Sequence, residues 1–326
     1  MHPRHRILAN LPRGTVVDDQ YEILAPLGQG GVAHVYAAMQ LDIGLEVALK
    51  FITAHFSTEA LRVNYQQRLE AEARSVARVR HRHVVSARAL RPTVHLRLDD
   101  ETLQIDQPYF VMDRLFGHTL DVEIATRGAA APRRGLGLFL DALDGLAVAH
   151  EMGIVHKDIK PENLFLVDPL HPRREALVVM DFGVARDGEA ATIGSKLPFT
   201  PAYVAPEYID GHVVTPAVDV YQMGLVLVEL LSGARAAPSP QPMECIRAHM
   251  TGDLQIPDWL REGHLGQILS SALAIRYDER IPDARVFLSV LERVNPDDIE
   301  PIATSSDRPP APTDEDSQQR PTILES

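Results

Sequence analysis

The sequence is poor in cysteine and has no long apolar run. Cys245 is its one cysteine in 326 residues, so no disulfide can form within the chain, and such low usage is typical of a reducing compartment. No apolar run approaches the roughly 20 residues that a bilayer span needs. The basic N-terminus, MHPRHRILANLPRG, lacks the apolar core of a signal peptide. These absences predict a cytoplasmic protein without a membrane span.

The chain also lacks an excess of positive charge. It has 32 Lys and Arg against 45 Asp and Glu, a formal net charge of −13, which argues against nucleic-acid binding and remains compatible with a basic peptide partner. Its 14 histidines, including the HRH run at 81–83, show no ligand spacing with cysteine or carboxylates. We therefore expect scattered surface and structural histidines. The 45% hydrophobic content is enough for a substantial core.

The first third of the chain is rich in strand patterns. Residues 84–112 predict two or three strands around the polar turn LDDETLQIDQ, and a helical pattern runs from about Thr58 to Val79 with Glu72 on its apolar stripe. Three short strands separated by glycine-containing turns are predicted before it, at Tyr21–Leu27, Val32–Met39 and Leu45–Ile52.

From about residue 119 the pattern is mainly helical. We expect a helix ending at His150, two strands flanking the turn DPLHPRREA, a continuously apolar and therefore buried helix, and a last helix after Pro282. The last four of these segments are Leu164–Val167, Leu177–Met180, Val218–Leu231 and about Ala284 to Val294. Residues 295–326 are rich in Pro, Ser and acid and are predicted to be a disordered tail.

Two features of the strand-rich part point to phosphate binding. LGQGGVAHVY, residues 27–36, places glycines between two strand patterns, where bare backbone N–H groups can approach a phosphate, although a Gly-rich hairpin alone is weak evidence. In VALK, alternation puts Ala48 and Lys50 on one face of a strand. A lysine on an apolar face needs a partner, and Glu72 on the helix stripe needs one too, so we expect the two to pair.

The run HKDIKPEN, residues 156–163, places charged and amide side chains between two apolar segments. A turn has no general need for Asp158, Lys160 and Asn163 at these offsets. Asp181, in MDFG, ends a strand near this loop, and Asp181 and Asn163 can supply oxygen ligands to Mg²⁺. Asp158 is then free to orient a hydroxyl and Lys160 to neutralise phosphate charge. This arrangement predicts phosphoryl transfer.

In this order, these segments resemble the protein-kinase catalytic domain, most closely that of bacterial eukaryotic-like (Hanks-type) serine/threonine kinases. The signatures are LGQGG–VY, VALK, a helix Glu, HKDIKPEN, DFG, APE at 205–207 and VDVYQMGLVLVELLSG. The resemblance implies an α+β, bilobal fold over residues 14–294: a small antiparallel β-rich N-lobe (about 14–112) with one regulatory helix, a hinge (113–116) and a larger helical C-lobe (117–294). Residues 1–13 form an N-terminal segment.

The resemblance also assigns roles. Asp158 would accept the substrate hydroxyl's proton, Lys50 would hold the ATP phosphates with Glu72 as partner, and Thr200 would bond Asp158 and Lys160. Asn163 and Asp181 would bind Mg²⁺, with Mn²⁺ as an alternative ion. The remaining ATP contacts would come from the glycine loop, the adenine-binding residues, the gatekeeper and the hinge: Leu27, Gly28, Gln29, Gly30, Gly31, Val35, Ala48, Phe165, Met112, Asp113 and Leu115.

Further positions would organise the domain. His156, Phe182 and Val76 would stack between the lobes, Asp219 would anchor the catalytic loop, and Glu207 would pair with Arg280. Lys160 indicates a preference for Ser/Thr over Tyr. Glu162 and Glu229 match positions at which some relatives read basic residues near the phosphosite. Protein substrates with a basic residue there are one expectation, and a plain helix role for Glu229 is the equal alternative.

Some residues depart from the family pattern. Ala33 replaces the third loop glycine, Phe199 replaces a frequent glycine, and Lys157 replaces the Arg that receives the activation-loop phosphate in a bidentate manner. Dependence on phosphorylation of the loop candidates Thr192 and Ser195 is therefore an open question.

The predicted tail contains two further candidate phosphosites. Thr313 and Thr322 each have an acid three residues on, and their phosphorylation would create a docking site for a phosphothreonine-binding partner; a plain solvated tail is the alternative.

Two other functional classes compete with an active protein kinase. A pseudokinase scaffold would bind ATP without transfer, but its usual mark is loss of Lys50, Asp158 or Asp181, all of which are present. A small-molecule kinase of the aminoglycoside type usually lacks the KPEN lysine and the APE segment, and both are intact here.

Overall fold

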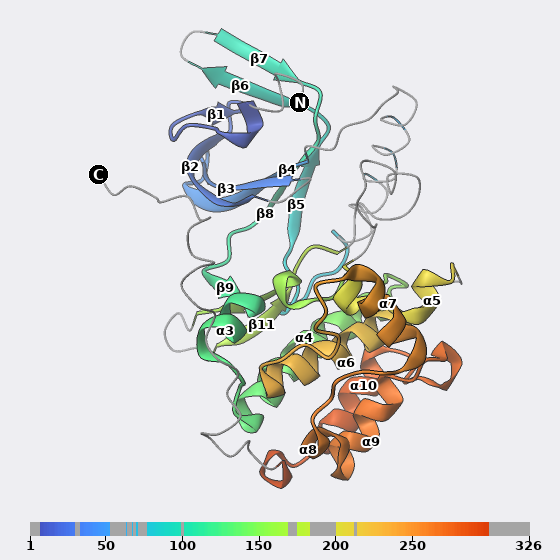
Figure 1. The fold of residues 1–326 in the computed structure, drawn as a ribbon. Helices are drawn as coiled ribbons and strands as arrows, with labels where there is room; N and C mark the ends of the chain where they lie inside the picture. Colours follow the sequence, from blue (N-terminus) through green and yellow to red (C-terminus); the bar gives the residue numbers. More distant parts are fainter. Residues whose placement is uncertain are drawn as a thin grey trace, which may run out of the picture.

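The computed structural model describes two lobes joined by a short connection (Figure 1). The described residues are 7–29, 33–52, 63, 67, 70, 77–98, 101–168, 175–182, 200–211 and 214–299. All structural statements below refer to these residues.

The N-lobe is an eight-stranded sheet whose paired strands are all antiparallel, in the order β5-β8-β4-β3-β2-β1-β6-β7. The first three predicted strands are confirmed as β2, β3 and β4 to within two residues. The segment 84–112 contains four strands rather than two or three, because its two alternating runs pair with each other as the β6–β7 hairpin. The strands are β1 (Val16–Val17), β2 (Tyr21–Gln29), β3 (Ala33–Gln40), β4 (Leu45–Ile52), β5 (Ala87–Arg91), β6 (Val94–Leu98), β7 (Glu101–Ile105) and β8 (Tyr109–Asp113).

The β6–β7 hairpin lies at the opposite edge of the sheet from β5 and is joined to the rest through β1 (Figure 1). Val17 of β1 pairs with Leu96 of β6. The turn after β1 reinforces this junction, because the Asp18 carboxylate accepts hydrogen bonds from His95 N at 2.8 Å and from the Tyr109 hydroxyl at 2.5 Å. A single turn thus ties the hairpin to β8, which lies next to the opposite edge strand β5.

The segment before β1 belongs to the N-lobe core. Leu8 and Leu11 are buried in the same apolar cluster as the inner face of the sheet. The Tyr36 hydroxyl donates to Leu8 O at 3.0 Å and accepts from Leu11 N at 3.2 Å. Residues 7–13, which the sequence resemblance left outside the kinase-like region, therefore complete the hydrophobic core of this lobe.

Side chains of β4 alternate between the two faces of the N-lobe sheet, one of which packs into the lobe's core. Val47, Leu49 and Phe51 of β4 all lie in the apolar cluster. Because successive side chains of a strand point to opposite faces, Ala48 and Lys50 lie on the other face. This confirms the predicted shared face of these two residues.

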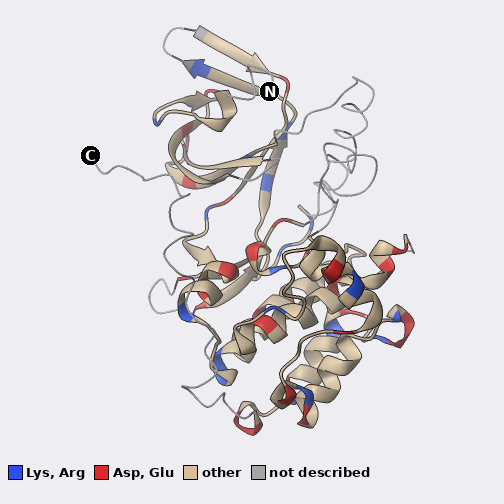
Figure 2. Ribbon diagram, viewed as in Figure 1, with Lys and Arg blue, Asp and Glu red and all other residues tan. Residues whose placement is uncertain are grey.

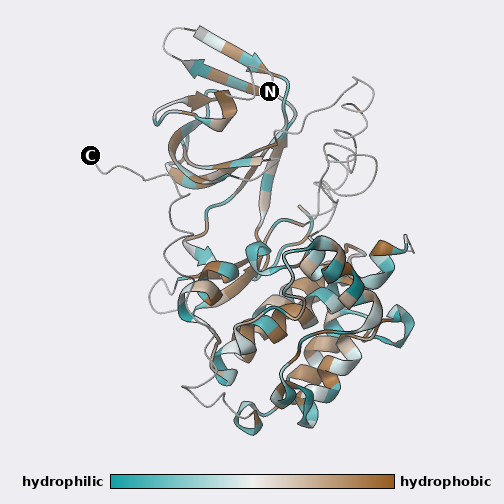
Figure 3. Cartoon of the chain, viewed as in Figure 1, coloured by the Kyte–Doolittle hydropathy of each residue, from teal (hydrophilic) through white to brown (hydrophobic). Residues whose placement is uncertain are grey.

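The C-lobe is built around α6 (Ala217–Ser232), of which every residue from Ala217 to Leu231 is buried, as predicted for its continuously apolar sequence (Figure 3). The long α4 (Pro132–Glu151) packs against α6 and against α10 (Ala284–Leu291). The other helices are α3 (Leu120–Arg127), α5 (Pro206–Ile209), α7 (Pro242–Thr251), α8 (Asp258–Arg261) and α9 (Gly263–Ala272).

Short elements complete the C-lobe. A three-stranded antiparallel sheet in the order β11-β10-β9 lies on its N-lobe side. The strands and 3₁₀ helices are β9 (Gly117–Thr119), β10 (Leu164–Val167), β11 (Ala176–Val179), η1 (Pro161–Asn163), η3 (Pro201–Tyr203), η4 (Tyr277–Glu279) and η5 (Pro296–Asp298).

Three boundaries differ from the sequence-based expectation. The last helix ends at Leu291 rather than at Val294. Of residues 295–299, expected to open a disordered tail, Pro296–Asp298 form η5 and Ile299 is buried in the C-lobe core. Residues 77–80 are not helical, so the helix expected to run to Val79 does not reach it, and Val79 packs into the C-lobe cluster. Most of this predicted regulatory helix, including Glu72, lies outside the described residues.

Lys and Arg are interspersed with Asp and Glu along the described chain (Figure 2). None of the helices in the described part has the length and apolarity required to cross a bilayer.

The packing of the N-terminal segment predicts that Leu8→Ala destabilises the domain by about 2–4 kcal/mol, because it leaves a cavity in the N-lobe core. Leu41→Ala removes the same side chain from an exposed position and should change the free energy of unfolding by less than about 0.5 kcal/mol. Urea unfolding of the two variants measures the difference, and equal stabilities would show that residues 7–13 do not contribute to the core.

Candidate active site

The loop between α4 and β10 is held in place by one buried carboxylate. Asp219 of α6 has no exposed surface, and it accepts hydrogen bonds from His156 N at 2.6 Å and Lys157 N at 2.7 Å. Burial alone would raise the pKa of Asp219, but the hydrogen bonds that its carboxylate accepts, first of all the one from His150, hold it below its ordinary value. The ionised carboxylate therefore anchors the loop, as the resemblance implied.

Two buried histidines adjoin this anchor, and their partners fix their tautomers. His150 Nδ1 lies 3.0 Å from Ala284 N, so it accepts that hydrogen bond, and its Nε2–H donates to Asp219 at 2.9 Å. His156 Nε2 donates to Met180 O at 2.7 Å, and burial lowers the pKa of His156. A neutral His156 thus joins the catalytic loop to the strand end that carries Asp181.

Lys157 has a strained backbone with φ of 69°. Both of its backbone polar groups are fixed: the N–H by Asp219, and the carbonyl by Gln222 Nε2 at 3.3 Å. Gln222 also accepts a hydrogen bond from Ile159 N at 2.9 Å. Such strain persists only where the surroundings over-determine the backbone, and here α6 does so from two successive turns.

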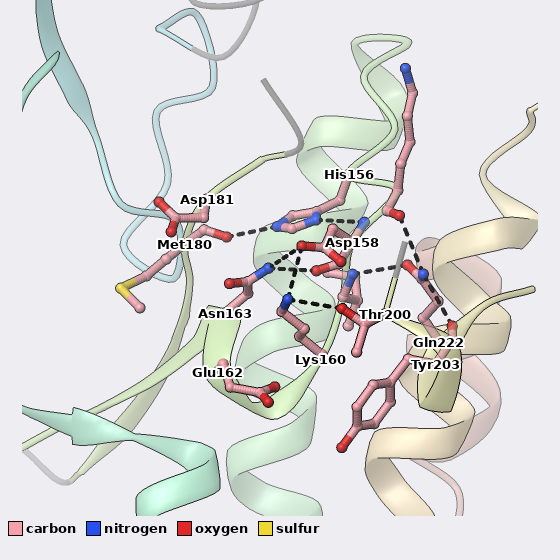
Figure 4. Close-up of polar contacts among 12 residues, drawn as sticks. His156, Asp158, Lys160, Glu162, Asn163, Met180, Asp181, Thr200, Tyr203 and Gln222 are labelled. Carbon is pink, nitrogen blue, oxygen red and sulfur yellow. Dashed lines mark hydrogen bonds and ion pairs between the residues drawn. The ribbon is translucent and has the colours of Figure 1, made fainter. Parts of the chain in front are cut away.

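The side chains of the loop gather around Asp158 (Figure 4). Asn163 Nδ2 donates to the Asp158 backbone carbonyl at 2.7 Å and to its carboxylate at 2.9 Å. Lys160 Nζ lies 3.3 Å from the same carboxylate and donates to Thr200 Oγ1 at 3.1 Å. Lys160 therefore bridges Asp158 and Thr200, so the structure brings these four predicted residues together.

Asp181 links this cluster to the N-lobe. Its carboxylate lies 2.6 Å from Lys50 Nζ of β4, and its own backbone has φ of 52°. Burial would raise the pKa of Asp181, but the charge of Lys50 and its hydrogen bond outweigh that effect and lower it. The observed partner of Lys50 is thus the acid of the other lobe; the expected Lys50–Glu72 pair involves a residue outside the described part of the chain.

The predicted adenine-contacting residues share the sheet face that carries Lys50. Val35 is the cross-strand partner of Lys50, and Met112 is that of Ala48, so Val35, Ala48 and Met112 lie on the face opposite the N-lobe core. From the C-lobe, Phe165 lies on the face of β10 opposite Leu164 and Leu166, which belong to that lobe's core.

The glycine loop and the hinge flank this face. Leu27, Gly28 and Gln29 are exposed at the end of β2, where an added Cβ at Gly28 would meet no atom within 4 Å. Gly30 and Gly31 lie outside the described residues. At the hinge, Asp113 pairs with Arg88 at 2.5 Å, and Leu115 is half-buried.

Of two other predicted contacts, the structure shows one completely and one in part. Arg280 donates to both carboxylate oxygens of Glu207, at 2.6 and 3.0 Å. The rings of His156 and Phe182 lie 4.6 Å apart, whereas Val76, the third member of the predicted stack, lies outside the described residues.

The sequence analysis did not identify Gln222, His150 or Tyr203. Gln222 follows Asp219 by about one helical turn. Two polar residues on one side of an otherwise apolar helix indicate buried polar partners, so this pattern could have identified Gln222. His150 and Tyr203 gave no comparable signal, because their partners lie far away in the chain: Asp219 for His150 and Glu229 for Tyr203.

Comparison with known proteins agrees with this architecture. The protein kinase domain family matches residues 21–286, and the chain belongs to that family. The structure resembles the kinase domain of Mycobacterium tuberculosis PknI, with a TM-score of 0.63 and 22% identity, over 87% of this chain and 98% of that one. That likeness confirms the bilobal kinase fold.

Within the family, the chain is a catalytic domain of the Hanks type found in bacterial serine/threonine kinases. It is 30% identical over 287 residues to "Serine/threonine-protein kinase PknB" of Mycolicibacterium smegmatis, covering 86% of this chain and 43% of the relative. It is 32% identical over 243 residues to "Serine/threonine-protein kinase pkn2" of Myxococcus xanthus, covering 73% of this chain and 27% of the relative. The chain thus spans less than half the length of these curated relatives.

A third histidine fixes the backbone just after Thr200. His249 of α7 donates from Nε2 to Pro201 O at 3.0 Å and accepts at Nδ1 from the Tyr221 hydroxyl at 2.9 Å. Burial lowers the pKa of His249 from 6.5 to about 4. The folded protein therefore keeps this ring neutral where the unfolded chain protonates it.

This shift predicts that stability falls as the pH drops from about 6.5 towards 4, because the unfolded state binds the extra proton there. His249 should contribute about 2 kcal/mol of the loss between pH 7 and pH 5. Urea unfolding at both pH values should show a smaller pH dependence for His249→Gln than for the wild type. The exposed-site control His264→Gln should retain the wild-type dependence, and an unchanged His249→Gln profile would contradict the assignment.

Proposed function

We propose that the chain is an active Mg²⁺/ATP-dependent serine/threonine protein kinase that transfers the ATP γ-phosphate to Ser and Thr hydroxyls of protein substrates and autophosphorylates. The observation that carries the proposal is the Lys160 bridge between Asp158 and Thr200, next to a Lys50–Asp181 pair that spans the lobes. A scaffold that only bound ATP would have no need to position Asp158 and Lys160 together.

The site residues fit ATP and a divalent cation. A lowered pKa keeps Asp181 ionised, and Figure 4 shows the Asn163 amide oxygen turned away from Asp158, so both residues offer oxygens to Mg²⁺, or to Mn²⁺ in its place. When bound, the cation neutralises phosphate charge during transfer. Lys50 would hold phosphate oxygens, and Val35, Ala48 and Phe165 would enclose the adenine between the lobes.

The chain's own groups account for the handling of the hydroxyl. Asp158 would accept the hydrogen bond of the substrate hydroxyl and orient it, while Lys160 would stabilise charge that develops on the transferred group. Thr200, which accepts from Lys160, would keep the lysine in reach of both. These roles use the contacts that Lys160 makes with Asp158 and Thr200.

The finer features of the proposal concern location and regulation. We place the protein in the cytoplasm, with proteins as substrates and no role for nucleic acid. Lys157 replaces the arginine that reads a loop phosphate, so activity would not require phosphorylation of Thr192 or Ser195. The expected basic residue near the phosphosite depends on Glu162 and Glu229, whose partner in the structure is Arg235.

Incubation with Mg²⁺ and ATP should add mass to the wild-type protein in steps of about 80 Da, one per phosphate. Asp158→Asn should lose these increments, because the amide cannot accept the proton, while still binding ATP. Intact-mass spectrometry measures both, and mapping of the modified residues tests Thr192 and Ser195 directly.

Asp253→Asn, a neutralised aspartate at an exposed position, serves as the control and should autophosphorylate like the wild type. Absence of increments in the wild type, with ATP binding intact and a basic peptide also left unmodified, would instead support the pseudokinase scaffold.

We further propose that phosphorylation of Thr313 and Thr322 creates the docking site for a phosphothreonine-binding partner. A chain truncated after residue 299 should then keep its loop phosphorylation but lose binding to a forkhead-associated domain, and Thr313→Ala/Thr322→Ala should behave likewise. A pull-down after ATP treatment checks this, and undiminished binding by either variant would exclude the tail as the docking site.

A further inference from the structure

An arginine of the chain lies between the two carboxylates that were expected to contact the substrate. Arg235 follows α6 in the loop that begins at Gly233, whose left-handed backbone (φ 76°) caps the helix with a bond from its N–H to Glu229 O. This turn carries the chain back along the helix end. Arg235 Nε then lies 3.5 Å from Glu229 Oε1, and its Nη2 lies 4.0 Å from Glu162 Oε1.

These groups form an acidic pocket, defined here as Glu162, Glu229 and Tyr203. The Tyr203 hydroxyl donates to Glu229 Oε2 at 2.5 Å, and the Arg235 guanidinium lies over the Tyr203 ring at 5.8 Å from its centroid. Burial raises the pKa of Glu229, against the lowering effect of the tyrosine hydrogen bond and the arginine charge. The pocket is thus partly desolvated and suited to a cation.

The charge of the acidic pocket is only partly balanced. Two carboxylates share one guanidinium, and Glu162 Oε2 is buried without a hydrogen-bond partner among the described residues. A buried carboxylate oxygen without a donor is costly, which indicates that a further donor belongs there.

The acidic pocket adjoins the place where a substrate chain must run. Glu162 lies two residues after Lys160, and Tyr203 lies three residues after Thr200, with Tyr203 N bonded to Thr200 O at 3.0 Å. Figure 4 shows Glu162 and Tyr203 on the same side of the Lys160–Thr200 contact. A peptide whose hydroxyl reaches Asp158 would therefore place a neighbouring residue at this pocket.

The contacts of Arg235 are those of an exchangeable group. Its side chain is 48% exposed, and its ion-pair distances are 3.5 and 4.0 Å. Arg280 provides the contrast, since it is fully buried and makes two hydrogen bonds to Glu207, the longer of them 3.0 Å. Arg280 is a structural arginine, whereas Arg235 can leave its carboxylates for water.

We propose that Arg235 is a specificity-determining residue that occupies the acidic pocket from within the chain and competes with a basic side chain of the protein substrate. The proposal rests on the kinase function proposed above. The wild-type enzyme then discriminates only weakly between substrates with and without a basic residue near the phosphosite. Loss of Arg235 opens the pocket to that residue.

The test uses a set of peptides with one phosphoacceptor serine and a single arginine placed at each neighbouring position in turn, with glutamine as the reference. For the wild type, kcat/KM should differ by less than about threefold between arginine and glutamine at every position. In Arg235→Ala the arginine peptide should gain about tenfold at one position, mainly through KM, since an ion pair in a desolvated site acts on binding.

Matched variants distinguish a change in substrate preference from a structural effect of the substitution. Adding Glu229→Gln to Arg235→Ala should abolish the gain, and Arg276→Ala, which removes an exposed arginine paired with Asp278, should leave the wild-type ratios. Arg235→Gln keeps most of the side-chain length without its charge and should reproduce the gain, so the test does not depend on the alanine variant folding well.

Peptide binding to Asp158→Asn, followed by fluorescence anisotropy with and without Arg235→Ala, tests the same idea without phosphoryl transfer. Tighter binding of the arginine peptide when Arg235 is absent supports the proposal even if the wild type phosphorylates no peptide, an outcome that would count against the kinase function alone. Ratios and affinities unchanged by Arg235→Ala, or strong arginine selectivity already in the wild type, would overturn it.

Discussion

The fully buried carboxylate of Asp219 is the constraint on which the catalytic half of the molecule depends. It draws the backbone of the catalytic loop onto α6, and through His150 it also reaches the first residue of α10. Removal of one partner from a buried, charged hydrogen-bond network leaves the others unsatisfied, which is far more costly than the net gain of any single bond. The buried, mainly apolar helix α6 therefore holds this polar network in place. Gln222, one turn after Asp219, extends the network to Ile159 and Tyr203.

Two residues of the site are held in left-handed backbone conformations, Lys157 and Asp181. Each is fixed by partners on another element: Lys157 by α6, and Asp181 by Lys50 of the N-lobe. His156 connects the two through its hydrogen bond to Met180. These contacts form a continuous series from α6 to the N-lobe sheet, with the strained residues Lys157 and Asp181 near its two ends. The series fixes the orientation of the Asp158 and Asp181 carboxylates.

Local patterns in the sequence predicted most elements of the fold, because alternation and helical periodicity report which face of a segment is buried. The motif resemblance predicted the cluster at Asp158, which the structure assembles. Contacts between distant segments were predicted only where a family motif carries them, as for Glu207 and Arg280. Nothing near Leu8 indicates that Tyr36 will bind its carbonyl, and nothing near Arg235 indicates Glu162. Such pairs depend on the tertiary path of the chain, where single side chains meet without any periodic signal. Gln222 was not predicted either, although a polar residue on an otherwise apolar helix indicates a buried polar partner.

The pairing of β1 with β6 has a consequence for the order in which the molecule is made. Val17 leaves the ribosome roughly 80 residues ahead of its partner Leu96, which at 5–20 residues per second is a delay of about 4–16 s. During that interval one edge of the nascent sheet has unpaired backbone groups, and Asp18 lacks the hydroxyl of Tyr109. The N-lobe therefore cannot be completed strand by strand as it emerges. Asp18 is among the last residues of the lobe to reach its final bonds, and the open edge of β1 is exposed to other nascent chains until synthesis has passed β6.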